Sequence, residues 1–233
     1  MKKIGIIGAM ELEVETLKSR LTVKNMIKKA NMEFYEGILE GTSVVIVRSG
    51  VGKVNAGICV QILADLFEVT HVINTGVAGS LNPQIDIGDI VISTDALYHD
   101  VDATIFGYQP GEVPQLGRRE FTADLELVRL AATVCQEVNP DLHVFTGRIV
   151  SGDQFISDRA TKDKIINVFK GYCTEMEGAA IAQAATLNDI PFIIIRAISD
   201  KADDSATMDY PEFERKAAQD CARLTAQLVA HIK

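Results

Sequence analysis

The sequence predicts a three-layer α/β fold, in which helices cover both faces of a central mixed, mostly parallel β-sheet. Strand-like and helix-like patterns alternate along the chain, and Pro191–Asp200 (PFIIIRAISD) carries an almost unbroken apolar run. Such runs are typical of strands that are buried on both faces, as in parallel sheets between helices. No repeat, linker or low-complexity segment interrupts the alternation, so we expect residues 1–233 to form a single domain.

In the first half of the chain, local periodicity places the elements. A buried strand is expected at Lys3–Gly8, followed by a helix that begins near Glu11. A hairpin, a helix and two buried strands follow, with bounds Glu33–Leu39, Ser43–Ser49, Ala56–Phe67, Thr70–Thr75 and Asp89–Ser93.

The second half opens with a long segment, Tyr98–Phe121, that shows no periodicity and is rich in Gly, Pro, Asp and aromatic residues. Segments longer than about 15 residues without periodicity are usually functional or disordered, and the aromatic residues here favour order. Strands and helices then alternate again, at Ala123–Val138, Val144–Ser151, Ala160–Phe169, Cys173–Met176, Glu177–Leu187, Pro191–Asp200 and Pro211–Ile232.

Composition and charge exclude several classes of protein. With 47% apolar and 24% charged residues the chain is typical of globular proteins, and its net charge of −9 argues against a nucleic-acid or anionic-membrane surface. No apolar run reaches transmembrane length. The first apolar run stops at Glu11, too early for a signal peptide, so we expect a cytoplasmic protein.

Neither the cysteines nor the histidines are spaced as metal ligands, so we expect no metal and no other cofactor. No C-x-x-C pair occurs, and the cysteines are expected to be reduced core residues. They lie far apart in apolar surroundings, at Cys59, Cys135, Cys173 and Cys221.

Two glycine-containing turns resemble phosphate-binding motifs but lack their key residues. The turn after the first strand does not complete G-x-G-x-x-G, and Val54 stands where a P-loop needs Ser or Thr. Glu11, Glu13 and Glu15 open the first helix. Acids are favourable at any helix N-terminus, but a phosphate-binding turn would not carry carboxylates. A phosphate ligand at this turn is therefore not expected.

Three acidic residues, Glu13, Glu177 and Asp200, lie near the carboxyl ends of predicted strands. Ligands of open α/β sheets bind at these ends, so the three carboxylates could converge on one crevice. Asp200 has a turn cap as its alternative role, and Glu175 could be a solvated surface acid.

A crevice with carboxylates, glycine-rich edges and the flat ring of Phe155 suits a neutral ligand that combines hydroxyl groups with an aromatic base, such as a nucleoside. Cleavage of a sugar's anomeric bond commonly uses two carboxyl groups around an oxocarbenium-like transition state. The residues therefore point to glycosidic-bond cleavage.

The sequence as a whole resembles the 5′-methylthioadenosine/S-adenosylhomocysteine nucleosidases of the nucleoside phosphorylase superfamily. The resemblance covers nearly the whole chain and rests on GIIGAMELE (Gly5–Glu13), SGVGKVNA (Ser49–Ala56), NTGVAGS (Asn74–Ser80), YHDVDATIFGY (Tyr98–Tyr108), VSGDQFI (Val150–Ile156), EMEGAAIA (Glu175–Ala182) and RAISD (Arg196–Asp200). It implies a nucleoside phosphorylase-like fold. It also implies hydrolysis of methylthioadenosine, S-adenosylhomocysteine and 5′-deoxyadenosine to adenine and the 5′-substituted ribose, in methionine salvage and removal of S-adenosylmethionine by-products.

The same resemblance implies roles for individual residues. Glu13 would activate the attacking water, Asp200 would protonate adenine N7, and Glu177 would bind the ribose hydroxyls. Other implied substrate-binding residues are Met10, Val51, Val77, Ala78, Gly79, Phe155, Ile156, Glu175, Met176, Arg196, Ser199 and Tyr210.

Of these, Phe155 would stack on adenine, and Tyr210 would line the pocket for the 5′-substituent. The family usually has Ser where Val77 stands and Phe where Tyr210 stands. The first difference removes a side-chain hydroxyl, and the second could alter the preference for the 5′ group.

Family members form a two-fold dimer, and the resemblance implies a homodimer here. Phe106, Tyr108 and Pro114, in the long segment Tyr98–Phe121, would then enter the pocket of the neighbouring subunit. Aromatic residues on an exposed loop form an apolar patch, which is typical of an interaction site. The alternative is a loop folded over its own subunit.

Two other functions stay open. A purine nucleoside phosphorylase would hold phosphate with an Arg, but Asn74 and Thr75 occupy that neighbourhood, and Arg48 is the one loose cation beside a glycine turn. A non-catalytic sensor would bind adenine nucleosides without releasing adenine.

Overall fold

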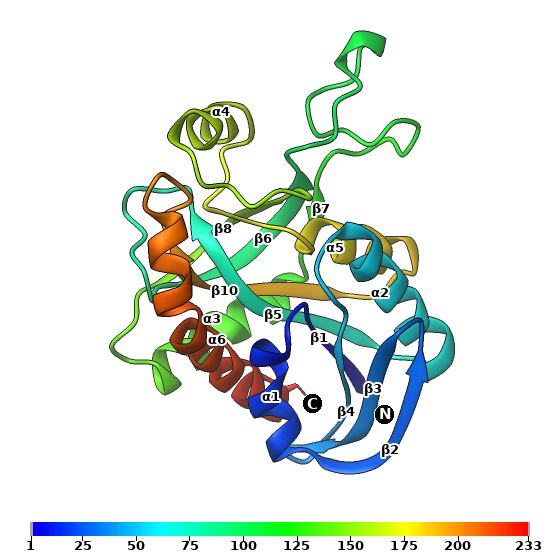
Figure 1. Ribbon diagram of the computed structural model, residues 1–233. Helices are drawn as coiled ribbons and strands as arrows, with labels where there is room; N and C mark the ends of the chain where they lie inside the picture. The colour runs from blue at the N-terminus through cyan, green and yellow to red at the C-terminus, as the bar shows by residue number, and fades with distance from the viewer. Residues whose placement is uncertain (1, 233) are drawn as a thin grey trace.

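The computed structural model describes residues 2–232 and contains a mixed sheet covered by helices on both faces (Figure 1). The strands are β1 (Lys3–Gly8), β2 (Thr22–Lys29), β3 (Met32–Leu39), β4 (Thr42–Arg48), β5 (His71–Ser80), β6 (Ile90–Tyr98), β7 (Phe121–Thr122), β8 (Val144–Ser151), β9 (Cys173–Glu175) and β10 (Phe192–Asp200). The helices are α1 (Glu11–Arg20), α2 (Lys53–Phe67), α3 (Leu125–Val138), α4 (Arg159–Phe169), α5 (Gly178–Leu187) and α6 (Ala206–His231), with a short 3₁₀ turn at Thr104–Phe106.

The strand pairing brings several carboxyl ends together. The order is β10-β6-β8-β9-β5-β1-β4-β3-β2, with β7 beside β6, and β10 also pairs with β5. Parallel pairs join β4, β1, β5 and β10, and likewise β6, β8 and β9. Since β5 pairs with both β9 and β10, the two parallel groups meet at its carboxyl end.

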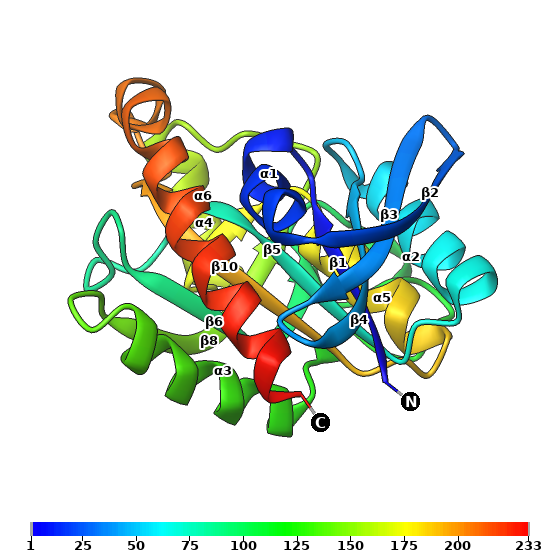
Figure 2. The same ribbon diagram turned by 90° about the horizontal axis from the view of Figure 1, so that it is seen from below.

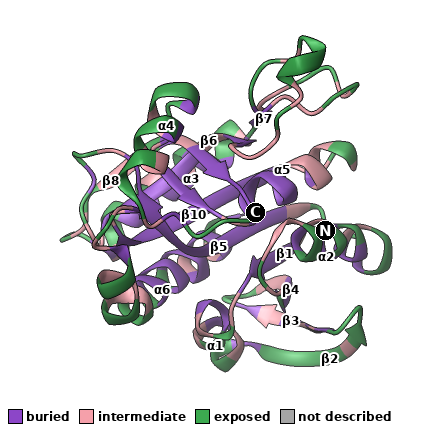
Figure 3. Ribbon diagram, turned by 45° about the horizontal axis from the view of Figure 1, so that its top comes forward, coloured by how far each residue is buried: buried purple, intermediate pink, exposed green. Residues whose placement is uncertain are grey.

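Helices cover the sheet in two layers. Helices α1, α3 and α6 pack on one face, which is turned toward the viewer in Figure 2, while α2 and α5 pack together on the other. Figure 3 shows the sheet buried at the centre and the outer sides of the helices exposed. Buried Ala179, Ala180 and Ala182 on α5 let that helix lie close to the strands, as their size predicts.

Two elements differ from the sequence-based expectation. Strand β2 is not predicted because its side chains are exposed almost throughout, so it has no apolar face to reveal a period of two. Helix α6 begins at Ala206, before the expected start at Pro211. The exposed residues ahead of this proline can satisfy their backbone carbonyls with water, so the helix continues through Pro211.

The cysteine prediction is confirmed, since all four cysteines are free and buried. Within residues 2–232, no helix combines the length and apolar character needed to cross a membrane. The same residues contain no cluster of His, Cys, Asp or Glu arranged to hold a metal ion.

Candidate active site

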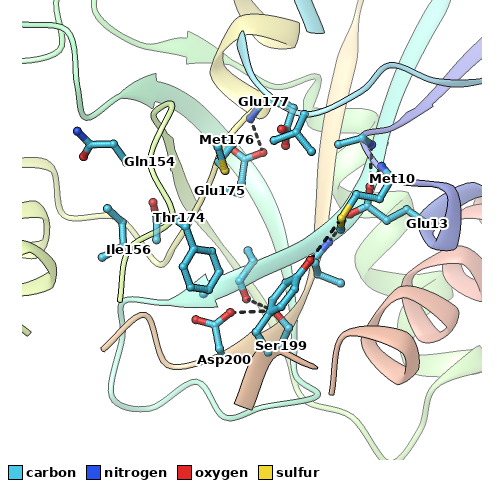
Figure 4. Close-up of a pocket in the computed structure, with 17 residues that line it drawn as sticks. Met10, Glu13, Gln154, Ile156, Thr174, Glu175, Met176, Glu177, Ser199 and Asp200 are labelled. Atoms are coloured by element: carbon cyan, nitrogen blue, oxygen red, sulfur yellow. Dashed lines mark hydrogen bonds between the residues drawn. The ribbon is translucent and has the colours of Figure 1, made fainter. Parts of the chain in front are cut away.

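A cavity of about 210 Å³ lies at the carboxyl ends of β1, β5, β8, β9 and β10. Figure 4 shows Met10 and Glu13 on one side of it, Ser199 and Asp200 on another, and Glu175, Met176 and Glu177 on a third. The described residues that line it are Ala9, Met10, Glu13, Val51, Val77, Ala78, Gly79, Gln154, Phe155, Ile156, Thr174, Glu175, Met176, Glu177, Ser199, Asp200 and Tyr210.

Glu13 is buried and held by three backbone donors. Its Oε2 accepts hydrogen bonds from the N–H groups of Ala9 at 2.7 Å and Met10 at 2.9 Å, and its Oε1 accepts one from Val77 at 3.1 Å. The first two bonds show that Glu13 does cap helix α1, while the third ties it to β5. Burial raises the pKa of Glu13, although the Arg196 charge and these hydrogen bonds oppose the rise.

The glycines of β5 make room for two carboxylates. A Cβ added at Gly76 would lie 2.5 Å from Glu13 Oε1, and one added at Gly79 would lie 2.7 Å from Asp200 Oδ1. For Gly76, the structural reason for the absence of a side chain is the close packing of Glu13.

Asp200 lies at the last position of β10 and faces the cavity. Its Oδ2 accepts a hydrogen bond from the Ser199 hydroxyl at 2.9 Å, and its Oδ1 accepts one from the Ala202 N–H at 2.8 Å. Asp200 therefore lines the pocket and also caps the following turn, so its two expected roles are compatible. Burial raises the pKa of Asp200, and the two hydrogen bonds oppose this rise.

Glu175 is not a solvated surface acid, which corrects the alternative considered for it. It is buried and forms an ion pair with Arg196, and it also accepts hydrogen bonds from the Ser151 hydroxyl and the Gly178 N–H. Arg196 is itself buried behind the lining, where it also donates to Asn74. It lies outside the set of residues that line the cavity.

Glu177 connects the cavity to the start of helix α2. Its Oε1 accepts a hydrogen bond from the Gly52 N–H at 2.8 Å. Burial, together with the nearby charge of Glu175, raises the pKa of Glu177 to about 8.

Two aromatic rings meet at the mouth of the cavity. Phe155 and Tyr210 are in edge-to-face contact with ring centroids 5.5 Å apart, and Phe155 is 48% exposed. The Tyr210 hydroxyl donates to Met10 Sδ at 3.3 Å. An exposed ring beside a cavity is available to stack on a flat ligand.

Comparisons with known proteins identify the family. The model of the phosphorylase superfamily matches residues 3–230. A 5′-methylthioadenosine/S-adenosylhomocysteine nucleosidase of Halalkalibacterium halodurans is 42% identical over 233 residues, which is 100% of both chains.

Similar solved structures also come from the nucleosidase family and from related hydrolases. The corresponding nucleosidase of Neisseria meningitidis, in complex with methylthio-immucillin-A, has a TM-score of 0.96 and 38% identity over 100% of both chains. A futalosine hydrolase of Helicobacter pylori has a TM-score of 0.93 and 30% identity, covering 99% of this chain and 98% of that one.

The chain belongs to the 5′-methylthioadenosine/S-adenosylhomocysteine nucleosidase family of the phosphorylase superfamily. The family and the fold class expected from the sequence are thereby confirmed.

Family resemblance placed most, but not all, of the lining residues. It does not identify Ala9, Gln154 and Thr174 as lining residues. Each of the three directly precedes, in the sequence, a residue that the resemblance does identify. Ala9 and Thr174 carry no chemistry that marks a site, and Gln154 is indistinguishable from a surface amide until the path of its loop is known.

The three residues expected in a partner's pocket lie outside the cavity of their own subunit. Phe106 is 81% exposed, and Pro114 is also exposed, while Tyr108 is half-buried. They belong to the green segment that extends away from the body of the molecule in Figure 1. Val113 and Leu116 of the same segment pack against the core of their own subunit.

Proposed function

We propose that this nucleosidase-family chain hydrolyses the N-glycosidic bond of 5′-methylthioadenosine and S-adenosylhomocysteine, and also of 5′-deoxyadenosine, in methionine salvage. The products are adenine and the 5′-substituted ribose. One observation carries the choice of hydrolysis: the lining contains Glu13, Glu175, Glu177 and Asp200, and no Lys or Arg among the described residues. Such a lining disfavours a phosphate nucleophile and leaves water as the attacking group.

The carboxyl groups divide the reaction between them. Burial raises the pKa of Asp200, which favours its role as the proton donor to adenine N7, and protonation makes the base a better leaving group as the C1′–N9 bond breaks. Glu13 takes a proton from the water that adds to C1′ of the oxocarbenium-like sugar. Glu177 accepts hydrogen bonds from the ribose hydroxyls, and Phe155 stacks on the base.

The other assigned residues support these steps. Ser199 holds the Asp200 carboxyl, while the buried Arg196 sets the charge balance behind Glu13 and Glu175. Met10, Val51 and Tyr210 surround the 5′-substituent, Met176 packs against the sugar, and the Ile156 backbone reads the edge of adenine. Val77 has no side-chain hydroxyl, and its backbone N–H donates to Glu13. Ala78 and Gly79 provide the floor of the pocket.

The test is adenine release from each nucleoside, measured by chromatography, with Glu13→Gln as the matched inactive variant. Wild-type protein should release adenine, and Glu13→Gln should be slower by roughly 10²–10⁴-fold, the usual contribution of a positioned base. Binding of the nucleosides without release of adenine would instead identify the non-catalytic sensor.

We further propose a homodimer whose two active sites are each completed by the neighbour's Phe106, Tyr108 and Pro114. Support comes from the exposed apolar tip of the long segment, where Ile105 is 88% exposed and Phe106 81%. Exposed apolar patches of this kind mark interaction sites, and a two-fold axis would bury both copies at once.

A mixing experiment separates a composite site from a self-contained one. Chains carrying Asp200→Asn are combined with chains carrying Phe106→Ala and Tyr108→Ala. A mixed dimer then contains one site with both features intact, so activity should reappear after subunit exchange. No recovery after demonstrated exchange would contradict the composite site.

We also propose that residues 1–233 constitute one nucleosidase domain that acts in the cytoplasm.

A further inference from the structure

The start of helix α2 is capped by carboxylates that come from remote parts of the chain. Its N-cap residue is Gly52, which offers no side chain to the free N–H groups of the first turn. Instead, the Gly52 N–H donates to Glu177 Oε1 at 2.8 Å and the Lys53 N–H donates to Asp153 Oδ1 at 2.9 Å. Carboxylates are favourable at this position because the helix dipole is positive there.

The two caps belong to different segments of the site. Glu177 is the residue assigned to the ribose hydroxyls, and Asp153 directly precedes Gln154, Phe155 and Ile156, which line the side assigned to adenine. The first turn of α2 therefore fixes the ribose side and the base side of the pocket relative to each other.

Asp100 and the Lys53 side chain complete this arrangement. Lys53 Nζ lies 2.6 Å from Asp100 Oδ2 and 3.7 Å from Asp153 Oδ2, and it sits 5.3 Å from the centre of the Tyr98 ring. Asp100 Oδ2 also accepts the backbone N–H of Asp153 at 3.0 Å. The Lys53 and Asp100 side chains are 22% and 16% exposed, so solvent screens this pair only in part.

The ring of His99 packs against the loop that leads from Gly152 to Ile156. A Cβ added at Gly152 would lie 2.4 Å from that ring, so the chain just before Asp153 has no room to shift toward it. The His99 N–H donates to the Ser151 carbonyl at 2.9 Å, and the Gly152 N–H donates to that of Glu175 at 3.1 Å. The Lys53–Asp100 ion pair therefore restrains the loop at Asp153, while the contacts of His99 and Gly152 restrain the chain just before it.

We propose that Lys53, Asp100 and Asp153 form a positioning clamp for nucleoside binding, in which Asp100 holds the adenine-side loop against the helix that also anchors Glu177. None of the three residues lines the cavity, so they act through Phe155, Ile156 and Glu177. The inference rests on the proposed function for its assay. Its main consequence is on affinity: without the clamp, the base loop samples positions that do not match the ribose carboxylate.

Asp100→Asn tests the clamp with the smallest change of shape. It keeps the volume but removes the charge that faces Lys53. The Michaelis constant for methylthioadenosine and the Kd for adenine should each rise roughly tenfold or more, as expected for loss of hydrogen bonds to a charged group. The turnover number should change by less than about threefold, because neither Glu13 nor Asp200 contacts the clamp.

Lys53→Met and the double variant show whether the two residues act together. If they form one unit, Lys53→Met with Asp100→Asn should bind adenine about as weakly as the worse single variant, because coupled residues are not additive. The matched control is Glu36→Gln, which removes one charge from the similarly exposed Lys3–Glu36 pair at 2.8 Å on β1 and β3. It should leave both constants unchanged.

The adenine titration keeps failure of the clamp distinct from failure of the proposed function, because it requires no turnover. A wild-type protein that binds adenine but cleaves no nucleoside would overturn the function and leave the clamp measurable. Adenine affinity and Michaelis constant within twofold of wild type in Asp100→Asn would overturn the clamp. An equal rise in Glu36→Gln, or additive effects in the double variant, would do the same.

Discussion

Gly76→Ala should disable the reaction by moving one carboxylate. The added Cβ would lie 2.5 Å from Glu13 Oε1, whereas ordinary contacts begin at 3.4 Å, so the carboxylate must retreat by ~0.9 Å. The hydrogen bond from the Val77 N–H, at 3.1 Å, lies on the same oxygen and would be stretched beyond the usual range. Gly76 is in β5 without a positive φ, so alanine introduces no backbone strain.

The size of the effect follows from this displacement. A misplacement of about 1 Å in a catalytic group can lower a rate roughly 10²-fold, so kcat for adenine release should fall by about that factor. Adenine affinity should change little, because the base is assigned to the opposite wall. The assay is steady-state adenine release, with melting temperature and circular dichroism to verify folding.

Gly57→Ala is the matched control, because a Cβ at this α2 position meets no atom within 4 Å. Alanine favours the helix over glycine by about 0.5–1 kcal/mol, so this variant should be active and slightly more stable. A folded Gly76→Ala protein with the wild-type rate would refute the claim that the position of Glu13 limits the reaction.

Three further outcomes follow from the carboxyl groups. Asp200→Asn should lower kcat by roughly 10²–10⁴-fold while binding of an uncleavable nucleoside analogue persists; equal losses of binding and rate would show that capping is its only role. Glu177→Gln should narrow the difference between ribosides and their 2′- or 3′-deoxy analogues in kcat/KM, and unchanged discrimination would remove Glu177 from ribose binding. Because the Glu177 pKa rises from 4.5 to about 8 on folding, the folded state binds the extra proton in that window and the free energy of unfolding should fall as pH rises through it. Glu177→Gln should therefore show a smaller drop in melting temperature between about pH 5 and pH 8.5 than wild type, and an identical drop would contradict the assigned shift.

The sequence predicts those parts of the fold that depend on local pattern. Strands β1, β5 and β10 can be predicted because both faces of each strand are buried, which gives a nearly continuous run of apolar residues. Strand β2 is not, because an exposed edge strand needs no alternation, and the start of α6 is hidden because proline normally reads as a helix boundary.

The site also has residues that the sequence predicts and contacts that only the structure shows. Glu13, Glu177 and Asp200 stand out as acids at strand ends, and family resemblance adds their neighbours. The partnership of Glu175 with Arg196 is a tertiary contact between β9 and β10 that no local pattern encodes. The sequence also does not reveal that a side chain at Gly76 would collide with the Glu13 carboxylate, because the two residues are far apart in the chain.

The central claim is that water, not phosphate, attacks the sugar. Its most direct measurement is product analysis of methylthioadenosine incubated with the protein in phosphate-free buffer and again with added phosphate. The acidic lining predicts equal adenine release in both, with free methylthioribose as the sugar product. A requirement for phosphate, with the sugar recovered as its 1-phosphate, would contradict the account.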